Sequence, residues 1–371
     1  MGQRMKVGVV GCGAFCSGTH IPNLARNPGF ELVAFCDLDA KRLAALAETY
    51  RARFVTDDAE KVFADPAIAM VVCGTKPDAR LPLMRLAVKY GKPLFVEKPL
   101  CYREDEVDEM VSLMRRSAGP FMVGFNRPYS PMMQAIKPAF QRRREGNTLI
   151  LYRIIGEGAL WPESHKQAIL VRKESTIVHE VTHIFDLLNW MTDRAPSRVY
   201  TAGGGNVDNI ITLSYPDAIT AVIVAGDNAT AGFPKERIEI DTNGGTIVGD
   251  EFVEMRVVGF DETAWGRQFE FSQGGETCRG GIAEAAARAA AWRQSVTPEE
   301  RQYGYYYDRM VRVNKGHYEE LEHFRQSIEA GRPPDTDVIK GAMANLMAWR
   351  AVESWQRGAP VDLNFAYLNK L

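Results

Sequence analysis

Residues 5–16 read MKVGVVGCGAFC, an apolar run of strand length that ends in a glycine-rich turn. Gly11 would allow a tight turn there, and Gly13 would let the backbone come close to a pyrophosphate held by helix N-terminal amides. Cys16 stands where the third glycine of the G-x-G-x-x-G pattern would be, and its side chain is small enough to let the helix pack against the strand. With a helix expected over His20–Asn27, the stretch predicts the first unit of a dinucleotide-binding fold.

An acidic residue follows the next apolar run, Leu32–Phe35, at the distance that such a fold requires. The carboxylate of Asp37 could accept the ribose hydroxyls of the cofactor, or it could cap the helix expected from Asp39 to Tyr50. Leu38 comes next, where Arg or Ser would favour a 2′-phosphate. The sequence therefore predicts NAD as the cofactor, with NADP possible.

Strand-like and helix-like segments continue to alternate up to residue 124. The expected strands are 52–55, 70–73, 93–96 and 121–124, and the expected helices are 40–50, 59–63, 80–90 and 104–116. This alternation predicts a doubly wound parallel sheet with helices on both faces. Ligands of such sheets bind beyond the carboxyl ends of the strands, where we expect Gly11, Asp37, Gly74, Thr75, Glu97 and Asn126.

The pattern changes after residue 144, where strand-like runs follow one another without helices between them. They cover 149–155, 209–215, 218–225, 237–242, 246–249, 251–258 and 268–272. Helices are expected over 283–294, 308–328 and 338–357. Short strands in this arrangement predict a second domain with a large, mostly antiparallel sheet.

Composition restricts the class of protein. The chain has 371 residues, enough for two domains, with 46% apolar and 25% charged residues and a net charge of −2. This balance gives no reason to bind nucleic acid, and a small metabolite is the expected partner. The sequence shows no signal peptide or membrane span, and its six scattered cysteines indicate buried free thiols in the cytoplasm. A zinc site at Cys12 and Cys16 is disfavoured because no second ligand pair accompanies them.

Residues 176–192, TIVHEVTHIFDLLNWMT, concentrate three reactive side chains: His179, Glu180 and His183. On an α-helix, His179, His183 and Asp186 would share one face. HEVTH matches the H-E-x-x-H zinc motif, but it could equally be the polar wall of a cleft. A metallopeptidase needs a third ligand, and no Gly-x-x-His follows.

Several motifs together resemble the Gfo/Idh/MocA family of nicotinamide-dependent oxidoreductases. They are the Glu-Lys-Pro turn at 97–99, Asn-Arg at 126–127, the strand motif at 233–239 and the closing segment at 315–328. The resemblance spans essentially the whole chain. It implies an α/β protein: an N-terminal Rossmann doubly wound parallel sheet (1–125) plus a C-terminal α+β domain with a large, mostly antiparallel open sheet (126–371). The second domain would bind substrate and form a homodimer or homotetramer, and its closing helices could pack back on the first domain.

The resemblance also implies roles for particular residues. Lys98, His183 and Glu180 would be catalytic, with Lys98 and His183 handling the proton of a substrate hydroxyl. The residues expected at the cofactor are Gly11, Gly13, Ala14, Phe15, Asp37, Thr75, Glu97, Lys98 and Asn126. Those expected at the substrate are Arg127, Trp161, His165, His179 and His183. Lys76 departs from the proline of the family's T-P-x turn, and His179 stands where relatives carry Asp or Gly. No metal ligand is expected.

The implied reaction is hydride transfer between NAD and a secondary hydroxyl of a sugar, cyclitol or glycoside. Two alternatives stay open at this point. One is a redox-neutral enzyme that retains NAD and cleaves or epimerises a glycoside through a transient keto-sugar. The other is a non-catalytic binding protein of the same fold. A metal-assisted dehydrogenase is a less favoured reading of HEVTH.

Overall fold

The chain forms two compact units. The computed structural model describes residues 4–158, 176–204, 207–230, 232–297 and 309–371. Unit 1 comprises Met1–Asn126, Gly316–Leu346 and Phe365–Leu371, and unit 2 comprises Arg127–Lys315 and Met347–Asn364. The segment after residue 315 therefore contributes to both units. The assignment of residues 1–125 to cofactor binding and 126–371 to substrate binding and oligomerisation stays a prediction.

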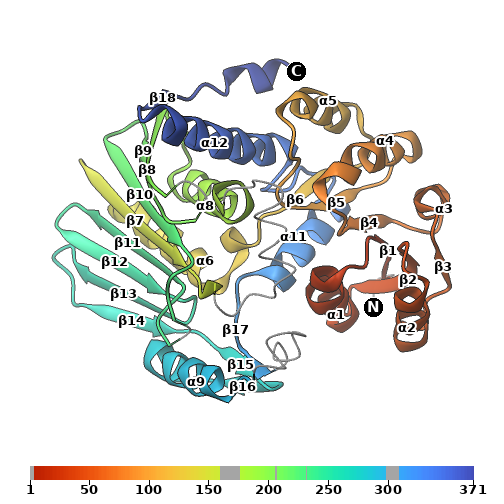
Figure 1. Ribbon diagram of the computed structural model, residues 1–371, viewed down its shortest axis with the longest axis horizontal. Coiled ribbons are helices and arrows are strands. Elements are labelled where there is room, and N and C mark those ends of the chain that lie inside the picture. The colour runs from red at the N-terminus through yellow and green to blue at the C-terminus, as the bar shows by residue number, and fades with distance from the viewer. Residues whose placement is uncertain (1–3, 159–175, 205–206, 231, 298–308) are drawn as a thin grey trace. The chain divides into compact units, whose positions relative to one another are not determined.

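Unit 1 is built on a parallel sheet of six strands in the order β3-β2-β1-β4-β5-β6 (Figure 1). The strands are β1 (Met5–Val10), β2 (Phe30–Cys36), β3 (Phe54–Thr56), β4 (Met70–Cys73), β5 (Leu94–Glu97) and β6 (Phe121–Gly124). The helices are α1 (Ile21–Arg26), α2 (Ala40–Tyr50), α3 (Ala59–Ala64), α4 (Arg80–Tyr90), α5 (Val107–Arg116) and α11 (His317–Glu329). This strand order is that of a dinucleotide-binding doubly wound fold, as the sequence predicted.

Burial explains why these segments are strands. All four residues of β4, β5 and β6 are buried, the pattern of a sheet covered on both faces. Phe35, Phe95 and Phe121 fill the layers beside the sheet and are almost wholly buried. Helix α2 begins at Asp39, whose carboxylate accepts the backbone N–H groups of residues 41 and 42.

The first helix begins irregularly. Residues Cys16–His20 form a π-helical turn, labelled η1, before the regular α1 begins at Ile21. The predicted helix over His20–Asn27 is thus confirmed to within one residue at each end, and the π turn that precedes it was not predicted. Such turns accommodate one extra residue, which changes the direction of the side chains within them.

Unit 2 is built on a nine-stranded sheet in the order β14-β13-β12-β11-β7-β10-β9-β8-β18. Its strands are β7 (Thr148–Ile155), β8 (Arg198–Gly203), β9 (Asn209–Ser214), β10 (Ile219–Gly226), β11 (Glu236–Thr242), β12 (Gly245–Asp250), β13 (Glu254–Gly259), β14 (Trp265–Gln268) and β18 (Val361–Asp362). Only β7 and β10 pair in parallel, so the sheet is mostly antiparallel, as expected.

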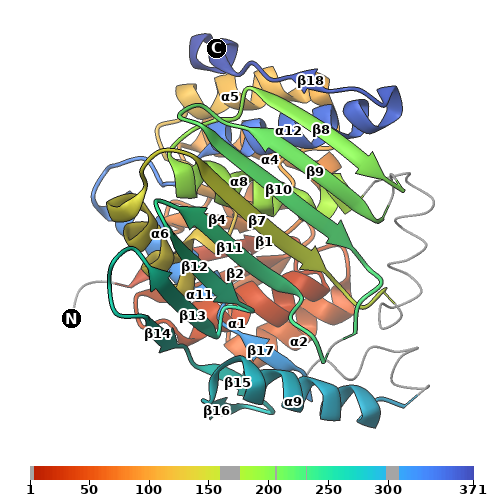
Figure 2. The same cartoon turned by 90° about the vertical axis from the view of Figure 1, so that its left-hand side faces the viewer.

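The two faces of this sheet differ. Residues of β7 alternate between buried and exposed, which identifies one covered and one open face. Helix α6 (Pro131–Arg143) packs against β12 and β13 on the covered face, where Gly249 leaves room for Ile136 and Met132. Figure 2 shows the open face towards the viewer, without a described helix across it. Its exposed apolar side chains include Leu149, Leu151, Tyr200, Ile210 and Val258.

Two sequence expectations for this part of the chain were wrong, and one long strand was not predicted. The expected helix 308–328 contains β17 (Val311–Val313) and begins as α11 only at His317, because Gly316 lies in the left-handed region at φ 93°. The expected strand 268–272 is divided between β14 and β15 (Phe271–Gln273). β15 pairs with β16 (Glu276–Cys278) and β17 in a small separate sheet. Strand β8 was missed.

The remaining helices are α8 (Thr182–Thr192), α9 (Gly281–Ser295) and α12 (Val338–Arg357). α9 and α12 lie close to their predicted ranges, whereas α8 begins six residues after the predicted start at Thr176 because a π-helical turn precedes it. Among the described residues, no helix combines the length and apolarity that crossing a bilayer requires. All six cysteines are buried and none is in a disulfide, as the sequence indicated.

Candidate functional site

The glycine turn after β1 requires its glycines for different reasons. Gly11 has a φ of 81°, and a Cβ atom there would lie 2.7 Å from the backbone N of Thr75. Gly13 has no atom within 4 Å of such a Cβ, so its backbone borders open space. The turns after β1 and β4 are therefore packed directly against each other, and the backbone at Gly13 is open to a ligand.

The carboxylate of Asp37 is held at the end of β2 by three groups. One oxygen accepts the backbone N–H of Cys12 at 2.7 Å, and the other accepts the N–H of Asp39 at 2.9 Å and Nη1 of Arg42 at 2.9 Å. Asp37 thus joins the glycine turn to β2. Arg42 was missed at the sequence level, where only the residue after Asp37 was considered, and it places a cation beside the expected ribose site.

Arg80 fixes the turns that carry Thr75 and Lys98. Its side chain is buried, and its guanidinium donates to the carbonyl oxygens of Thr75 at 2.9 Å, Lys98 at 3.4 Å and Pro99. Burial lowers the pKa of Arg80. These bonds join the turns after β4 and β5, so Arg80 helps to set the position of the Lys98 backbone. Nothing in the spacing of the motifs indicated this role.

Lys98 follows Glu97 at the end of β5, and its backbone N–H donates to the Glu97 carboxylate at 3.1 Å. The residues after Pro99 are held by Asn345. Its side chain accepts the N–H of Leu100 at 3.0 Å and donates to the carbonyl of Cys101 at 2.6 Å. The Glu-Lys-Pro turn is therefore held on both sides within unit 1.

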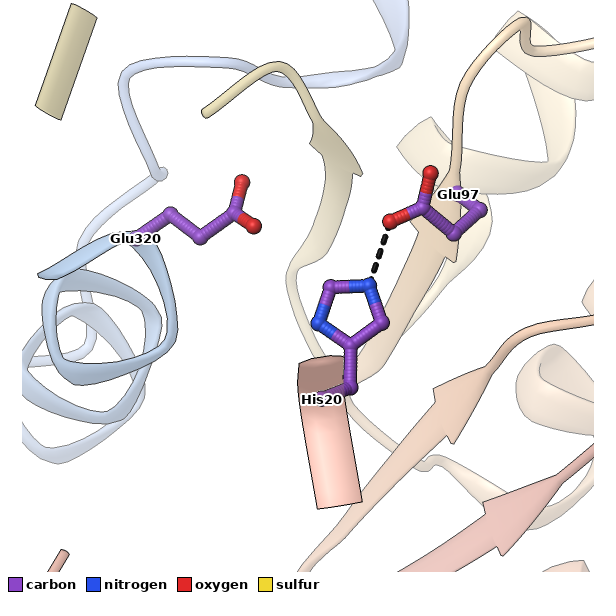
Figure 3. Close-up of side chains that lie close together, drawn as sticks. All are labelled: His20, Glu97 and Glu320. Carbon is purple, nitrogen blue, oxygen red and sulfur yellow. Dashed lines mark hydrogen bonds and ion pairs between the residues drawn. The ribbon is translucent and has the colours of Figure 1, made fainter. Parts of the chain in front are cut away.

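Glu97 also bonds His20, and Glu320 of α11 faces the same ring (Figure 3). Burial opposes the charge on Glu97, but His20, Lys98 and Arg80 hold the pKa of its carboxyl below the usual value. Glu320 in turn lies 3.2 Å from Nδ1 of His317. The group is a chain of two acid–imidazole pairs inside unit 1, which the sequence did not predict.

His20, Glu97 and Glu320 form the one group of possible metal ligands in the part of the chain that the structure describes. The ligand atoms of His20, Glu97 and Glu320 lie within 4.8 Å of one another. Glu97 already pairs with His20, and Glu320 pairs with His317. These acid–imidazole pairs explain why the carboxylates lie close together without a metal ion. Within the described chain, neither histidine of HEVTH belongs to such a group.

Phe15 lies over this cluster. Its ring meets those of His20 and His317 edge-on, with centroids 5.4 and 5.7 Å away, and it is 49% exposed. An exposed aromatic ring directly after the glycine turn fits the predicted contact with a cofactor.

The HEVTH segment of unit 2 does not begin as a regular α-helix. Ile177–Val181 form a π-helical turn, labelled η6, and α8 starts at Thr182. The shared α-helical face expected for His179 and His183 is therefore altered, because the π turn changes the angle between successive residues. His183 is buried, whereas His179 and Glu180 are half-buried.

Glu236 is the centre of a buried polar network in unit 2. Its carboxylate accepts Nε and Nη2 of Arg127 at 2.7 and 2.9 Å, the Tyr152 hydroxyl at 2.8 Å and Nζ of Lys315 at 2.6 Å. Burial disfavours its charge, but Arg127 and Lys315 hold the pKa of Glu236 well below its usual range. Burial likewise opposes the charge of Arg127, and Glu236 raises its pKa overall. Arg127, expected at the substrate, thus has its guanidinium bonded to a protein carboxylate.

Glu180 of HEVTH lies beside this network. Its carboxylate is 3.7 Å from Nζ of Lys235 and 4.0 Å from Nη2 of Arg127. Glu180 raises the pKa of Lys235 against the effect of burial. Asp227, at the end of β10, has its pKa raised to about 6 by burial, with Lys235 opposing. Lys235, Glu236 and Asp227 were missed as site residues, although the sequence motif at 233–239 was noted.

The predicted site residues divide between the two units. Gly11, Asp37, Thr75, Lys98 and Asn126 belong to unit 1, whereas Arg127, His179, Glu180 and His183 belong to unit 2. The pairing of Lys98 with His183 therefore stays a prediction. Trp161 and His165 lie outside the described residues.

Residues 5–125 match the family model GFO_IDH_MocA, described as an oxidoreductase family with an NAD-binding Rossmann fold. A relative that covers nearly the full chain extends the similarity beyond this domain. Myo-inositol 2-dehydrogenase of Thermotoga maritima is 24% identical over 372 residues, covering 97% of this chain and 98% of the relative. Residues 5–125 therefore carry the NAD-binding domain of the Gfo/Idh/MocA oxidoreductase family.

A second relative and one solved structure are also similar to this chain. Inositol 2-dehydrogenase of Rubrobacter xylanophilus is 28% identical over 261 residues, which cover 66% of this chain and 71% of that protein. An oxidoreductase from Agrobacterium radiobacter was solved in complex with NAD+, L-tartaric acid and magnesium. It superposes with a TM-score of 0.76 at 17% identity, and the superposition covers 97% of this chain and 98% of that chain. At this identity the superposition supports the fold. The family match and the named relatives identify the chain as an NAD-dependent oxidoreductase.

Proposed function

We propose that the protein is an NAD(H)-dependent dehydrogenase of a cyclitol or sugar, acting on a secondary hydroxyl group. The observation that carries the proposal is a Rossmann unit with Lys98 fixed at the carboxyl end of β5 by Arg80 and Glu97. A lysine held at that edge of the sheet can assist removal of the hydroxyl proton. The full-length relative from Thermotoga maritima is named for oxidation of myo-inositol, which supports a polyol substrate.

The residues present fit NAD. Gly11 and Gly13 would border the pyrophosphate, Asp37 would accept the ribose hydroxyls, and Thr75 and Phe15 would flank the nicotinamide side. Bound there, NAD would accept hydride from the substrate carbon. Asn126, buried at the end of β6, would help to fix the cofactor.

Two side chains would carry the proton chemistry. Lys98 would hold the reacting hydroxyl, and His183 would take its proton as a neutral imidazole. Glu180 and His179 would orient the remaining hydroxyl groups of the polyol.

A substrate screen tests this function. Inositols, pentoses, hexoses and glycosides are incubated with NAD and NADP in parallel, and formation of reduced cofactor is followed. We expect at least one polyol to reduce NAD. If every polyol leaves both cofactors oxidised, the proposal fails.

Asp37→Asn is expected to weaken NAD binding by roughly tenfold, because a charged acceptor for the ribose hydroxyls is lost. Binding of NADP should weaken less or improve, since Arg42 would lose its carboxylate partner and could reach a 2′-phosphate. Titration calorimetry with each cofactor measures both affinities. Asp58→Asn, which removes a helix-capping carboxylate from the start of α3, is the control. Equal losses for both cofactors in Asp37→Asn would contradict the assignment.

We further propose that the chain acts in the cytoplasm as a homodimer or homotetramer through the open face of the nine-stranded sheet. Exposed apolar side chains on that face, including Leu151 and Ile210, would be covered by a second copy. Light scattering after gel filtration is expected to give at least twice the chain mass. Leu151→Arg should lower that mass to one chain, whereas Leu371→Arg, at the same 37% exposure, should not. A monomeric wild-type protein would contradict the proposal.

A further inference from the structure

In the described part of the chain, the carboxylates of Glu236 and Glu180 lie within 4.0 Å of the Arg127 guanidinium, and they hold it unequally. Glu236 binds the guanidinium through two bonds of 2.7 and 2.9 Å, whereas the shortest approach to Glu180 is 4.0 Å. The second distance is too long for a hydrogen bond. Arg127 is thus directed to Glu236, although both carboxylates are within reach of a small movement.

The difference follows from the surroundings of the two acids. Glu236 is 1% exposed and begins β11, where its own backbone N–H is fixed by Glu251 at 2.8 Å. The side chain of Glu180 is 30% exposed and stands on the irregular π turn η6. An arginine can bind a carboxylate through two parallel bonds, and the buried acid offers that geometry.

We propose that Glu236 is a positioning residue, and this inference rests on the function proposed above. Glu236 holds the Arg127 guanidinium beyond hydrogen-bond distance of the Glu180 carboxylate, so that Glu180 can bind the hydroxyl groups of the polyol. Arg127 then has no direct contact with substrate, which differs from the expectation drawn from the sequence. Lys235 remains beside Glu180 as a more exposed cation, with 35% of its side chain accessible.

Charge explains what happens when Glu236 is neutralised. A glutamine in its place would be a poorer partner for a buried guanidinium, and a buried cation strongly favours an ionised acceptor. For Arg127, the remaining acid within 4.0 Å in the described part of the chain is Glu180. Lys315 would keep its interaction with the carboxyl of Glu251. Lys235 and Asp227 are the other described charged groups that interact with Glu180, and His179 and His183 lie on the same segment.

Glu236→Gln is therefore expected to raise KM for the polyol by about 10- to 30-fold, with a smaller effect on kcat, because Arg127 takes up oxygens of Glu180 that the substrate needs. Adding Arg127→Met to Glu236→Gln should return KM to within about threefold of wild type. A purely structural role would make the double variant worse than the single one. Glu239→Gln, on the same strand but bonded to Arg237, is the control and should leave KM unchanged.

Two results would overturn the inference: an unchanged KM in Glu236→Gln, or a double variant no better than the single one. If Glu236→Gln fails to fold, the double variant still decides, since a KM raised tenfold or more there would contradict the proposal. A crystal structure of Glu236→Gln separates this inference from the proposed function. We expect Arg127 within hydrogen-bond distance of Glu180, and an unmoved Arg127 would refute the inference even if the protein oxidises polyols. A wild-type protein without dehydrogenase activity would instead refute the function.

Discussion

Lys98→Met is expected to lower kcat by about 10²- to 10⁴-fold, the range in which a positioned proton-transfer group contributes. Methionine keeps the length of the side chain and removes the ammonium group. The turn itself should persist, because Arg80 binds the backbone carbonyl of residue 98 and Glu97 binds its N–H. The loss therefore reports chemistry rather than misfolding.

The measurement is steady-state oxidation of the best polyol, together with NAD affinity by calorimetry. NAD affinity should change by less than about threefold, since the glycine turn and Asp37 are untouched. Lys89→Met, on the exposed side of α4, is the matched control. Full activity in Lys98→Met would remove Lys98 from the catalytic residues.

His183→Asn should reduce kcat/KM for polyol oxidation by about 10²- to 10³-fold, because asparagine can bond the hydroxyl but cannot accept its proton. The residue is 6% exposed on α8, so its ring is held by packing. The wild-type protein should lose activity as the pH falls, since protonating the imidazole removes the base. This acid limb should be absent from the profile of the variant.

The pH profile of kcat/KM for both proteins decides this point. The control is His323→Asn in unit 1, where His323 accepts the N–H of Asp335 at 3.1 Å. An acid limb that persists unchanged in His183→Asn would assign the base to another group, of which Asp227 is a candidate because burial raises its pKa to about 6.

The first 125 residues of unit 1 could be predicted almost element by element, because their strands are continuous apolar runs and their helices have clear ends. Strand 70–73 and helices 40–50 and 80–90 agree with the structure at both ends. The π turn at Cys16–His20 could not be predicted, since an inserted residue leaves no distinct mark in an apolar period.

Unit 2 was harder to predict because its strand order depends on pairing between residues far apart in the sequence. The parallel pairing of β7 with β10 joins residues about seventy positions apart, which local patterns do not reveal. β8 (RVYTAG) was missed because its alternation is short and half of it is polar or glycine. The expected helix 308–328 failed at Gly316, whose positive φ ends the preceding segment.

The candidate site shows the same contrast. Residues in contiguous motifs, such as Lys98 and His183, could be named from the sequence. Their supporting partners could not, because Arg80 and Glu236 act on residues far away in the chain. Arg127 is the clearest case, since only the structure shows a buried carboxylate from a distant strand occupying its guanidinium.

Hydride transfer itself can be followed with isotopes. The protein is mixed with NAD and with inositols or sugars that carry deuterium on the ring carbons, and the reduced cofactor is analysed by mass spectrometry and NMR. Our account predicts reduced NAD that carries one deuterium on the nicotinamide ring, and that forms only in the presence of a polyol. Polyol conversion without net reduction of NAD, or no conversion of any polyol in the panel, would contradict it.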